Sequence, residues 1–196
     1  MILVKGKKNI NKGFTLIELI IGAIISLFIT GTLVYVFNEA NFFFKKQSYR
    51  ENVNNYADFV MNDIFSNTIN ANFVNIRPNE IVCGYKTDAN LDSTRIYRFS
   101  INKGVTANKE SLFPSLFHNR DRNRNYYMQV TEFGAEYTLQ AQQVDADVRD
   151  AVIDVFLGIK LHYKRGNKVI TEEFPYKRTI FTRYATVYNN SKENND

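Results

Sequence analysis

A long apolar run that carries a single charge dominates the N-terminal part of this chain. Between residues 14 and 37 the only side chain charged at neutral pH is Glu18. As an α-helix these 24 residues would be about 36 Å long, enough to cross a hydrocarbon core of about 30 Å. An ionised carboxylate in such a core costs about 2.5–3.5 kcal/mol. The run therefore predicts a membrane-spanning helix in which Glu18 has a positive partner, for which an α-amino group created by a cut before Phe14 is the obvious candidate.

The residues around the start of this run match a known processing signal. The sequence Lys-Gly-Phe-Thr-Leu-Ile-Glu over 12–18 resembles the prepilin signal of the type IV pilin superfamily, which includes pilins, minor pilins and the pseudopilins of type II secretion. The resemblance implies that a prepilin peptidase and methyltransferase cuts between Gly13 and Phe14 and N-methylates Phe14. It also implies that Glu18, the fifth mature residue, pairs with the Phe14 amine of a neighbouring subunit during assembly.

Two simpler interpretations fit this segment less well. An ordinary secretory signal peptide has an apolar region of 7–15 residues followed by a small-residue cleavage site, whereas this run is longer and residues 32–40 offer no such site. The other is an uncleaved anchor that tolerates Glu18. Lysines before the run place the N-terminus in the cytoplasm and the remainder outside. The resemblance implies a single pass through the cytoplasmic (inner) membrane, then a cell-surface or periplasmic filament.

Beyond the apolar run the pattern becomes that of an amphipathic helix. Apolar residues recur at steps of three and four and form one stripe: Tyr49, Val53, Tyr56, Val60 and Ile64. No proline occurs before Pro78, so nothing forces a break before about Asn72. Residues 42–46, three phenylalanines and two lysines, are typical of an anchor at the membrane interface.

The period of the apolar pattern then shortens to two, which indicates β-strands. Strands are predicted over 80–86, 94–101, 125–133, 152–163, 168–174 and 177–187, with a hairpin turn at 165–167. The predicted fold class is α+β, a long N-terminal helix packed on an antiparallel β-sheet head. The predicted parts are a leader (1–13), a transmembrane half-helix (14–37), an amphipathic half-helix (38–75), a head (76–188) and a disordered tail (189–196). Residues 51–64 and 178–190 also loosely resemble PilW-type minor pilins and GspJ-type pseudopilins.

The net charge of +5 does not by itself indicate a nucleic-acid partner. Residues 1–13 hold four of the 25 basic residues and no acid, which leaves 21 basic against 20 acidic residues in the remainder. One segment of the head still mixes guanidinium groups with aromatic rings, which can bind phosphate and stack on bases. Its candidate contacts are Arg120, Arg122, Arg124, Tyr126 and Tyr127. A solvated surface loop is the favoured interpretation, and nucleic acid is the less favoured partner.

Neither catalysis nor metal binding finds support in the sequence. The two histidines, His118 and His162, accompany no hydrolase or zinc-protease motif, so no enzyme and no cofactor is predicted. Acidic residues at 145, 147, 150 and 154 suggest calcium, but the glycine and glutamate of a calcium-binding loop are missing, and a solvated loop is favoured. The single cysteine, Cys83, excludes an intrachain disulfide and is expected to be buried.

Taken together, these features predict a structural, minor pilin-like subunit of a type IV pilus. The expected partners are the prepilin peptidase, other pilins or pseudopilins and the cytoplasmic membrane. Three alternatives stay open: a minor pseudopilin of a type II secretion system, a DNA- or surface-binding adhesin at a filament tip, and a solitary membrane-anchored receptor.

Overall fold

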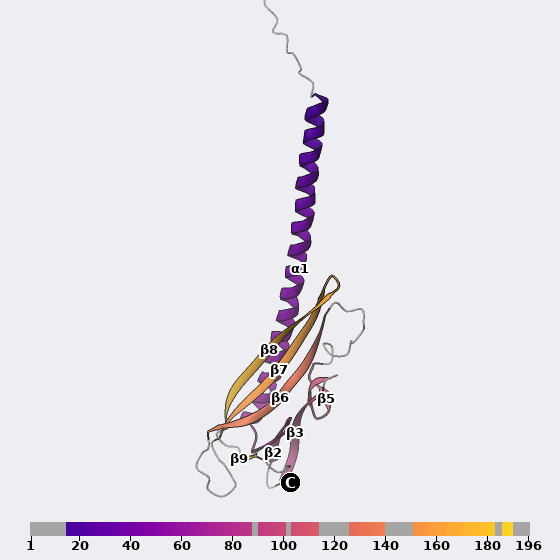
Figure 1. The fold of residues 1–196 in the computed structure, drawn as a ribbon. Helices are drawn as coiled ribbons and strands as arrows, with labels where there is room; N and C mark the ends of the chain where they lie inside the picture. The colour runs from indigo at the N-terminus through magenta and orange to yellow at the C-terminus, as the bar shows by residue number, and fades with distance from the viewer. Residues whose placement is uncertain are drawn as a thin grey trace, which may run out of the picture. The chain divides into compact units, whose positions relative to one another are not determined.

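The structure, a computed structural model, describes residues 15–87, 90–100, 103–113, 126–139, 151–182 and 186–189 (Figure 1). One long helix precedes two β-sheets, which confirms the α+β class. The elements are α1 (Leu16–Ile69), β1 (Phe73–Arg77), β2 (Glu80–Thr87), β3 (Asn90–Ser100), β4 (Gly104–Ala107), β5 (Glu110–Ser111), β6 (Tyr126–Leu139), β7 (Ala151–Arg165), β8 (Lys168–Thr182) and β9 (Thr186–Asn189). The chain forms two compact units, residues 1–45 and 46–196.

The C-terminal part of α1 supplies one side of the head's core. The predicted stripe is confirmed at Val53, Tyr56, Val60 and Ile64, which are all fully buried, whereas its first member, Tyr49, is half-buried. Two neighbours of the stripe differ in burial, since Met61 is buried while Phe59 is 45% exposed. This apolar face gives the helix its stability in the head, since isolated helices gain little from intrinsic propensity.

The helix ends at Ile69, earlier than the predicted limits of about 72 and 75. The amide N–H of Asn72 donates to the carbonyl of Gly84 at 2.8 Å, so the backbone there already bonds to β2. From Phe73 onward β1 pairs with β2 on one side and β9 on the other. The β-rich part of the head therefore begins at β1, before residue 76.

The six-stranded sheet has the strand order β5-β4-β3-β2-β1-β9. Its pairs are antiparallel except β1 with β9, which run parallel. The prediction of an antiparallel sheet therefore needs a correction at this edge. Strands β2 and β3 were predicted within a few residues of their bounds, whereas the short strands β1, β4 and β5 were not predicted.

The three-stranded sheet is an antiparallel meander, β6-β7-β8. The hairpin of β7 and β8 is confirmed, with a turn at Gly166 and Asn167. The predicted division of its second strand into 168–174 and 177–187 is wrong, because β8 runs from Lys168 to Thr182 without interruption. Pro175 pairs with Gly158 inside this ladder. The chain then enters the other sheet as β9, which includes Asn189 from the predicted disordered tail; residues 190–196 lie outside the described part.

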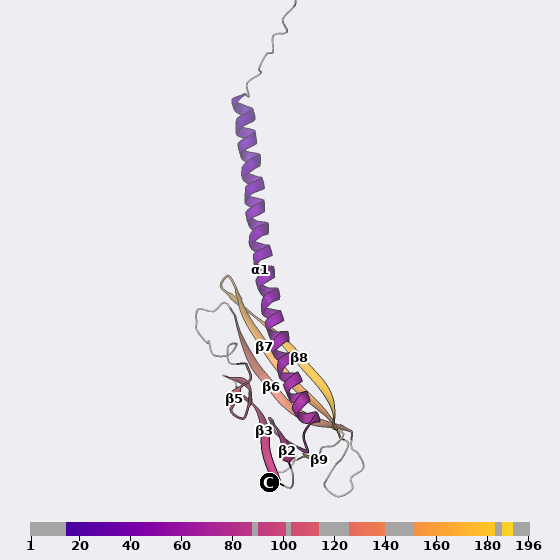
Figure 2. The same cartoon turned by 180° about the vertical axis from the view of Figure 1, so that it is seen from behind.

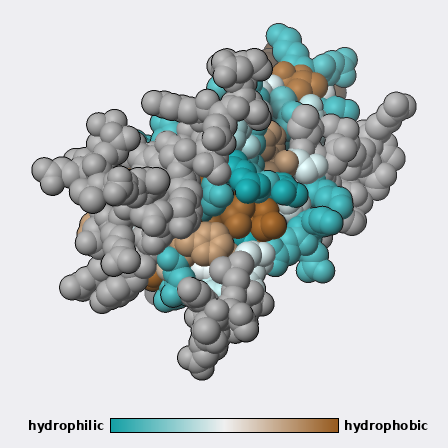
Figure 3. Space-filling model, turned by 90° about the horizontal axis from the view of Figure 1, so that it is seen from below, coloured by the Kyte–Doolittle hydropathy of each residue, from teal (hydrophilic) through white to brown (hydrophobic). Residues whose placement is uncertain are grey.

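The two sheets and the residue 46–69 part of α1 enclose the core. Figure 2 shows this part of the helix crossing the face of β6, β7 and β8, while β6 also lies against β1–β4. On the other flank the Tyr56 hydroxyl accepts a hydrogen bond from the Val105 amide of β4 at 2.7 Å. Seen from below, the described surface of the head has apolar patches bordered by hydrophilic residues (Figure 3). An apolar N-terminal helix packed on largely antiparallel sheets is a pilin-like architecture.

Replacing Ile64 by alanine is expected to lower the head's free energy of unfolding by about 2–5 kcal/mol, because a buried Ile→Ala change loses apolar contact and leaves a cavity. Ile64 is fully buried, whereas Ile69 on the same helix is 39% exposed. The same change at Ile69 is the matched control and should cost much less. Urea unfolding of the full chain in detergent, followed by near-ultraviolet circular dichroism, measures both. Equal losses would contradict the placement of the core.

Candidate functional site

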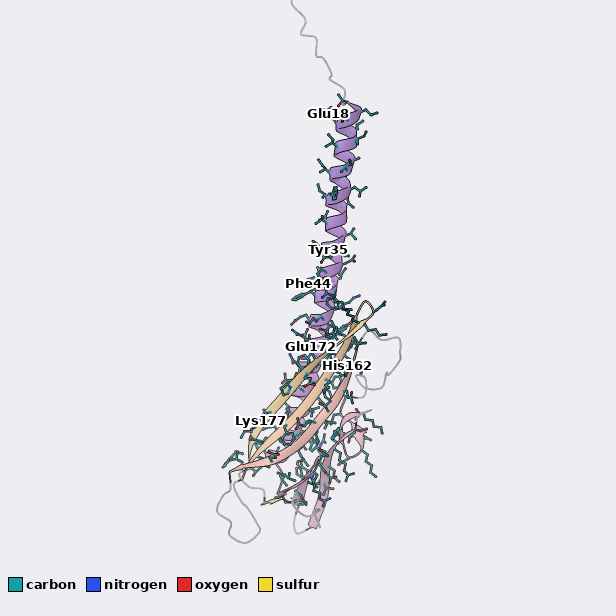
Figure 4. All side chains as sticks on the ribbon, viewed as in Figure 1. Glu18, Tyr35, Phe44, His162, Glu172 and Lys177 are labelled. Carbon is teal, nitrogen blue, oxygen red and sulfur yellow. The ribbon has the colours of Figure 1, made fainter. Side chains whose placement is uncertain are left out.

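Glu18 lies in the first turn of α1 and bonds to the residue just before the helix (Figure 4). The Thr15 amide donates to Glu18 Oε2 at 2.8 Å and the Thr15 hydroxyl donates to the same oxygen at 3.0 Å. The Glu18 amide in turn lies 3.3 Å from Thr15 Oγ1. These reciprocal contacts form a capping box, in which an N-cap threonine and a glutamate three residues later satisfy each other's backbone donors. Thr15 and Glu18 thus cap the N-terminus of α1, and Glu18 also places a carboxylate in the apolar segment.

The rest of the apolar segment presents hydrocarbon on all sides. Its large apolar side chains between Leu16 and Phe37 are 50–79% exposed. The hydroxyls of Thr30 and Thr32 donate to the carbonyls of Ser26 and Phe28, one turn earlier, at 2.8 and 2.9 Å. Polar groups satisfied within the helix carry a small penalty in lipid. In the described part of the chain, α1 is the helix long and apolar enough to span a membrane.

This arrangement suits association through an apolar helix. None of the ion pairs formed among the described residues includes Glu18. Its carboxylate retains lone pairs beyond those used by Thr15, so it can accept a further donor from outside the helix. The predicted cleavage residues, Gly13 and Phe14, lie outside the described residues.

The candidate nucleic-acid contacts do not gather at one surface in the described part of the head. Tyr126 stacks on Tyr49 of α1, with ring centroids 4.0 Å apart, and its hydroxyl accepts from Asn52 at 3.4 Å. Tyr127, on the opposite face of β6, stacks on His162 at 4.4 Å. The two tyrosines therefore do not share one stacking platform. Arg120, Arg122 and Arg124 lie outside the described residues.

His162 lies on the face of β7 that is turned away from α1, as expected, and it is half-buried there (Figure 4). Its Nδ1 is 2.9 Å from the Thr171 hydroxyl on β8. Burial, followed by the nearby charge of Lys160, lowers the pKa of this imidazole. His162 is thus neutral at physiological pH and packs between Tyr127 and Thr171. His118 lies outside the described residues.

The one described residue of the suggested calcium loop, Asp154, is engaged elsewhere. Its carboxylate accepts from the Thr179 hydroxyl at 2.6 Å and pairs with Lys177 at 2.7 Å. The part of the chain that the structure describes contains no cluster of three or more metal-ligating side chains. Residues 145, 147 and 150 lie outside that part.

Cys83 is buried, as predicted, and its sulfur lies 3.6 Å from the Thr68 hydroxyl of α1. Burial raises the pKa of the thiol to about 11. The thiolate is the reactive form of cysteine, so this side chain is inert at neutral pH and serves packing.

Sequence reasoning missed an ionic cluster that joins β8 to α1. Glu172 accepts from Arg50 at 2.8 Å and from Lys46 at 3.0 Å, and the Tyr163 hydroxyl donates to it at 2.7 Å. The Arg50 hydrogen bond, with further bonds from Tyr163 and Lys46, lowers the pKa of Glu172 to about 2. One signal could have revealed the cluster: Glu172 alternates with Ile170 and Phe174 on the inward face of β8, where a carboxylate needs a partner.

A second cluster joins the same helix to β3. Asp63 accepts from the Arg95 guanidinium at 2.9 and 3.0 Å and from the Tyr97 hydroxyl at 2.7 Å. Burial, followed by the hydrogen bond to Asp63, raises the pKa of Tyr97. Together the two clusters fix the register of α1 against both sheets.

The Glu172 cluster predicts a pH dependence of stability. A carboxyl whose pKa is depressed on folding contributes stability that is complete above its ordinary pKa, 4.5 here, and is lost as the pH falls toward about 2. Glu172→Gln is therefore expected to lower the unfolding midpoint at pH 6, and the difference from the unaltered chain should shrink as the pH approaches 2. Chemical unfolding of both chains at several pH values from about 6 down to about 2 measures this difference in midpoint.

Glu173 is the matched control for this experiment. It is the next residue, its side chain is 67% exposed, and it pairs with Lys160 on the other face of the sheet. Glu173→Gln should change the midpoint little at any pH, because exposed ion pairs contribute about 0–1 kcal/mol. A pH-independent effect of Glu172→Gln would contradict the role assigned to the cluster.

Comparison of the chain with protein-family models, with curated proteins and with solved structures finds no match.

Proposed function

We propose that this protein is a minor pilin-like structural subunit of a type IV pilus, cut by a prepilin peptidase and incorporated through its N-terminal helix. One observation carries the proposal: α1 continues from a lipid-length apolar segment into the core of a β-rich head, and its only charge in the apolar segment is the capped Glu18. A helix that is apolar on all sides must contact lipid or other helices. A pilin contacts lipid before assembly and neighbouring helices afterwards.

In this proposal the capping box and the cleavage site act in sequence. The leader keeps the chain in the cytoplasmic membrane until the peptidase exposes the Phe14 amine. The Glu18 carboxylate then accepts from the Phe14 amine of a neighbouring subunit, in an apolar surrounding where both charges are costly alone. The electrostatic gain from burying such a pair is offset by the cost of desolvating both charges. The pair therefore acts mainly on the axial position of the subunit in the filament, because it forms only when the subunit enters at the correct step.

A pseudopilin of a type II secretion system would use the same helix and the same pairing. The single cysteine fits both, since neither a minor pilin nor a pseudopilin requires the disulfide-closed loop of many major pilins. The neighbouring genes separate the two assignments, because pili and secretion systems carry different sets of assembly genes. The pilus assignment is the one proposed here.

The proposal is tested by following the full chain through cell fractionation. Surface filaments are sheared from cells that express the chain, and the filament and membrane fractions are probed with an antibody to the head. The chain should occur in the filament fraction and cross-link there to other pilins, and deletion of the prepilin peptidase should confine it to the membrane. A chain that stays in the membrane in both strains, with no pilin cross-link, would instead be a solitary membrane receptor.

A further inference from the structure

The turn that joins β7 to β8 is basic and exposed. It consists of Lys164, Arg165, Gly166, Asn167 and Lys168, and all five residues are exposed. The next residue, Val169, is 58% exposed. We refer to residues 164–169 as the basic tip. Its role is not explained by the core, because none of its side chains lies inside the head.

The contacts of β8 show toward which end of α1 the basic tip points. Along β8, Glu172 meets Arg50, Tyr176 meets Asn54 and Arg178 meets Asn62. Lower residue numbers on the strand thus match lower numbers on the helix, so the two elements run in the same direction. Lys168 precedes Glu172 by four residues, about 13 Å along an extended strand. The basic tip therefore lies toward the N-terminal end of the helical segment that begins at Lys46.

That end of the head is the end tied to the apolar segment. Lys46 follows Phe37, the last residue of the apolar run, by nine residues, which span about 14 Å as a helix. The chain between them carries Phe43 and Phe44, 63% and 70% exposed. Aromatic and basic residues in this position are typical of a membrane interface. The link is so short that the Lys46 end of the head stays near the surface of any bilayer that holds the apolar segment.

We propose that the basic tip is a docking surface for the anionic headgroups of the membrane in which the unassembled subunit is anchored. The proposal rests on the membrane span of the proposed function. Charge complementarity supports it, since Lys164, Arg165 and Lys168 carry three positive charges at the membrane-tied end of the head. Exposed Val169 adds apolar area for the interface. The contact would hold the head in one orientation on the lipid surface, so that removal of the subunit into a filament breaks it.

The experiment uses the full chain in lipid nanodiscs with a spin label on the basic tip. Asn167→Cys places the label at the turn, while native Cys83 is buried and inert. Ser66→Cys, an exposed site twenty residues beyond Lys46 on α1, is the control for the far part of the head, and Ser26→Cys reports insertion of the apolar segment. Collisions with oxygen and with a water-soluble nickel complex measure the depth of each label. Discs contain phosphatidylcholine alone or mixed with phosphatidylglycerol.

The label at Asn167 is expected to be protected from nickel in the anionic discs, less so in neutral discs or in high salt, while the label at Ser66 stays in water. Each lysine near an anionic surface changes the contact equilibrium about fivefold, so Lys164→Gln with Lys168→Gln should reduce it by about 25-fold. Lys103→Gln with Lys109→Gln, two exposed lysines in turns of the other sheet, is the control with equal loss of charge and should have little effect.

The outcomes separate this inference from the proposed function. If the Ser26 label lies in lipid but the Asn167 label is equally accessible to nickel in anionic and neutral discs, the docking surface is wrong and the membrane span stands. If the Ser26 label lies in water, both the membrane span and the docking surface are wrong. Protection that appears only in discs with two copies of the chain would assign the basic tip to a protein partner and overturn the lipid contact.

Discussion

The Gly13→Val chain is expected to keep residues 1–13 and to be missing from filaments. In the proposed function a prepilin peptidase brings the backbone between Gly13 and Phe14 into its active site, and valine adds a β-branched side chain, rigid at χ1, at a position where glycine has none. Immunoblots should show one slower band in the membrane fraction. Mass spectrometry of the unaltered chain from the same cells should find Phe14 as its N-terminal residue.

Gly31→Val is the matched control for this change. It adds the same side chain within the apolar segment of α1, beyond the predicted cleavage site, and a Cβ at Gly31 meets no atom within 4 Å. This variant should insert and be cut as the unaltered chain is. If the Gly13→Val chain were trimmed to Phe14 at the normal rate, or if the mature chain began at another residue, the prepilin interpretation would be wrong.

Glu18→Val is expected to leave membrane insertion and cutting intact but to lower incorporation into filaments by tenfold or more. Removing the carboxylate takes away a charge that costs about 2.5–3.5 kcal/mol in hydrocarbon, so the single chain should insert at least as well. In the filament the Phe14 amine of the neighbour would then be buried without its partner. Breaking a buried pair costs about 3–5 kcal/mol, and 1.4 kcal/mol corresponds to a factor of ten. The ratio of filament to membrane signal measures the effect.

Glu18→Gln separates pairing from capping. Glutamine preserves the capping box with Thr15, since glutamate and glutamine both serve at this position, but it carries no charge. If pairing with the amine is what matters, Glu18→Gln should assemble as poorly as Glu18→Val. Normal assembly of the glutamine variant would show that helix capping, and not charge pairing, is the role of Glu18.

The helix and the hairpin could be predicted because their information is local. The stripe from Val53 to Ile64 repeats at helical spacing, and the alternation from Ile153 to Tyr163 repeats at strand spacing. Both patterns remain visible whatever the rest of the chain does. The helix end could not be predicted, because at Asn72 it depends on the partner strand β2, which lies further along the chain.

Pro175 explains why β8 was divided in the prediction. A proline inside a run normally argues against a central strand, because it has no N–H to donate. Here β8 is the outer strand of its sheet and pairs with β7 alone. The ladder continues on both sides of the Pro175–Gly158 pair, and an outer strand is where a sheet tolerates proline. Whether a strand lies at the edge or in the centre of a sheet depends on the whole fold, so the local sequence around Pro175 does not predict it.

Glu18 could be singled out from the sequence because a lone charge in an apolar run is conspicuous. The ionic clusters that hold α1 against the sheets could not be predicted from the sequence, because they join residues far apart along the chain. Asp63 and Arg95 are 32 residues apart, and Arg50 and Glu172 are 122 apart. Each pair meets only once its strand lies beside α1, so the spacing of the residues in the sequence does not predict the contact.

The parallel pairing of β9 with β1 has a consequence for biogenesis. The six-stranded sheet is completed only when Thr186–Asn189 reaches Phe73–Ile76, so β1 lacks this partner until a strand that follows all the other described strands has been synthesised. Closing so long a loop is slow compared with forming the neighbouring hairpins. A chain truncated before Thr186 would thus keep an incomplete sheet in which the backbone groups at the free edge of β1 lack their partners, so β9 is the segment that completes the head.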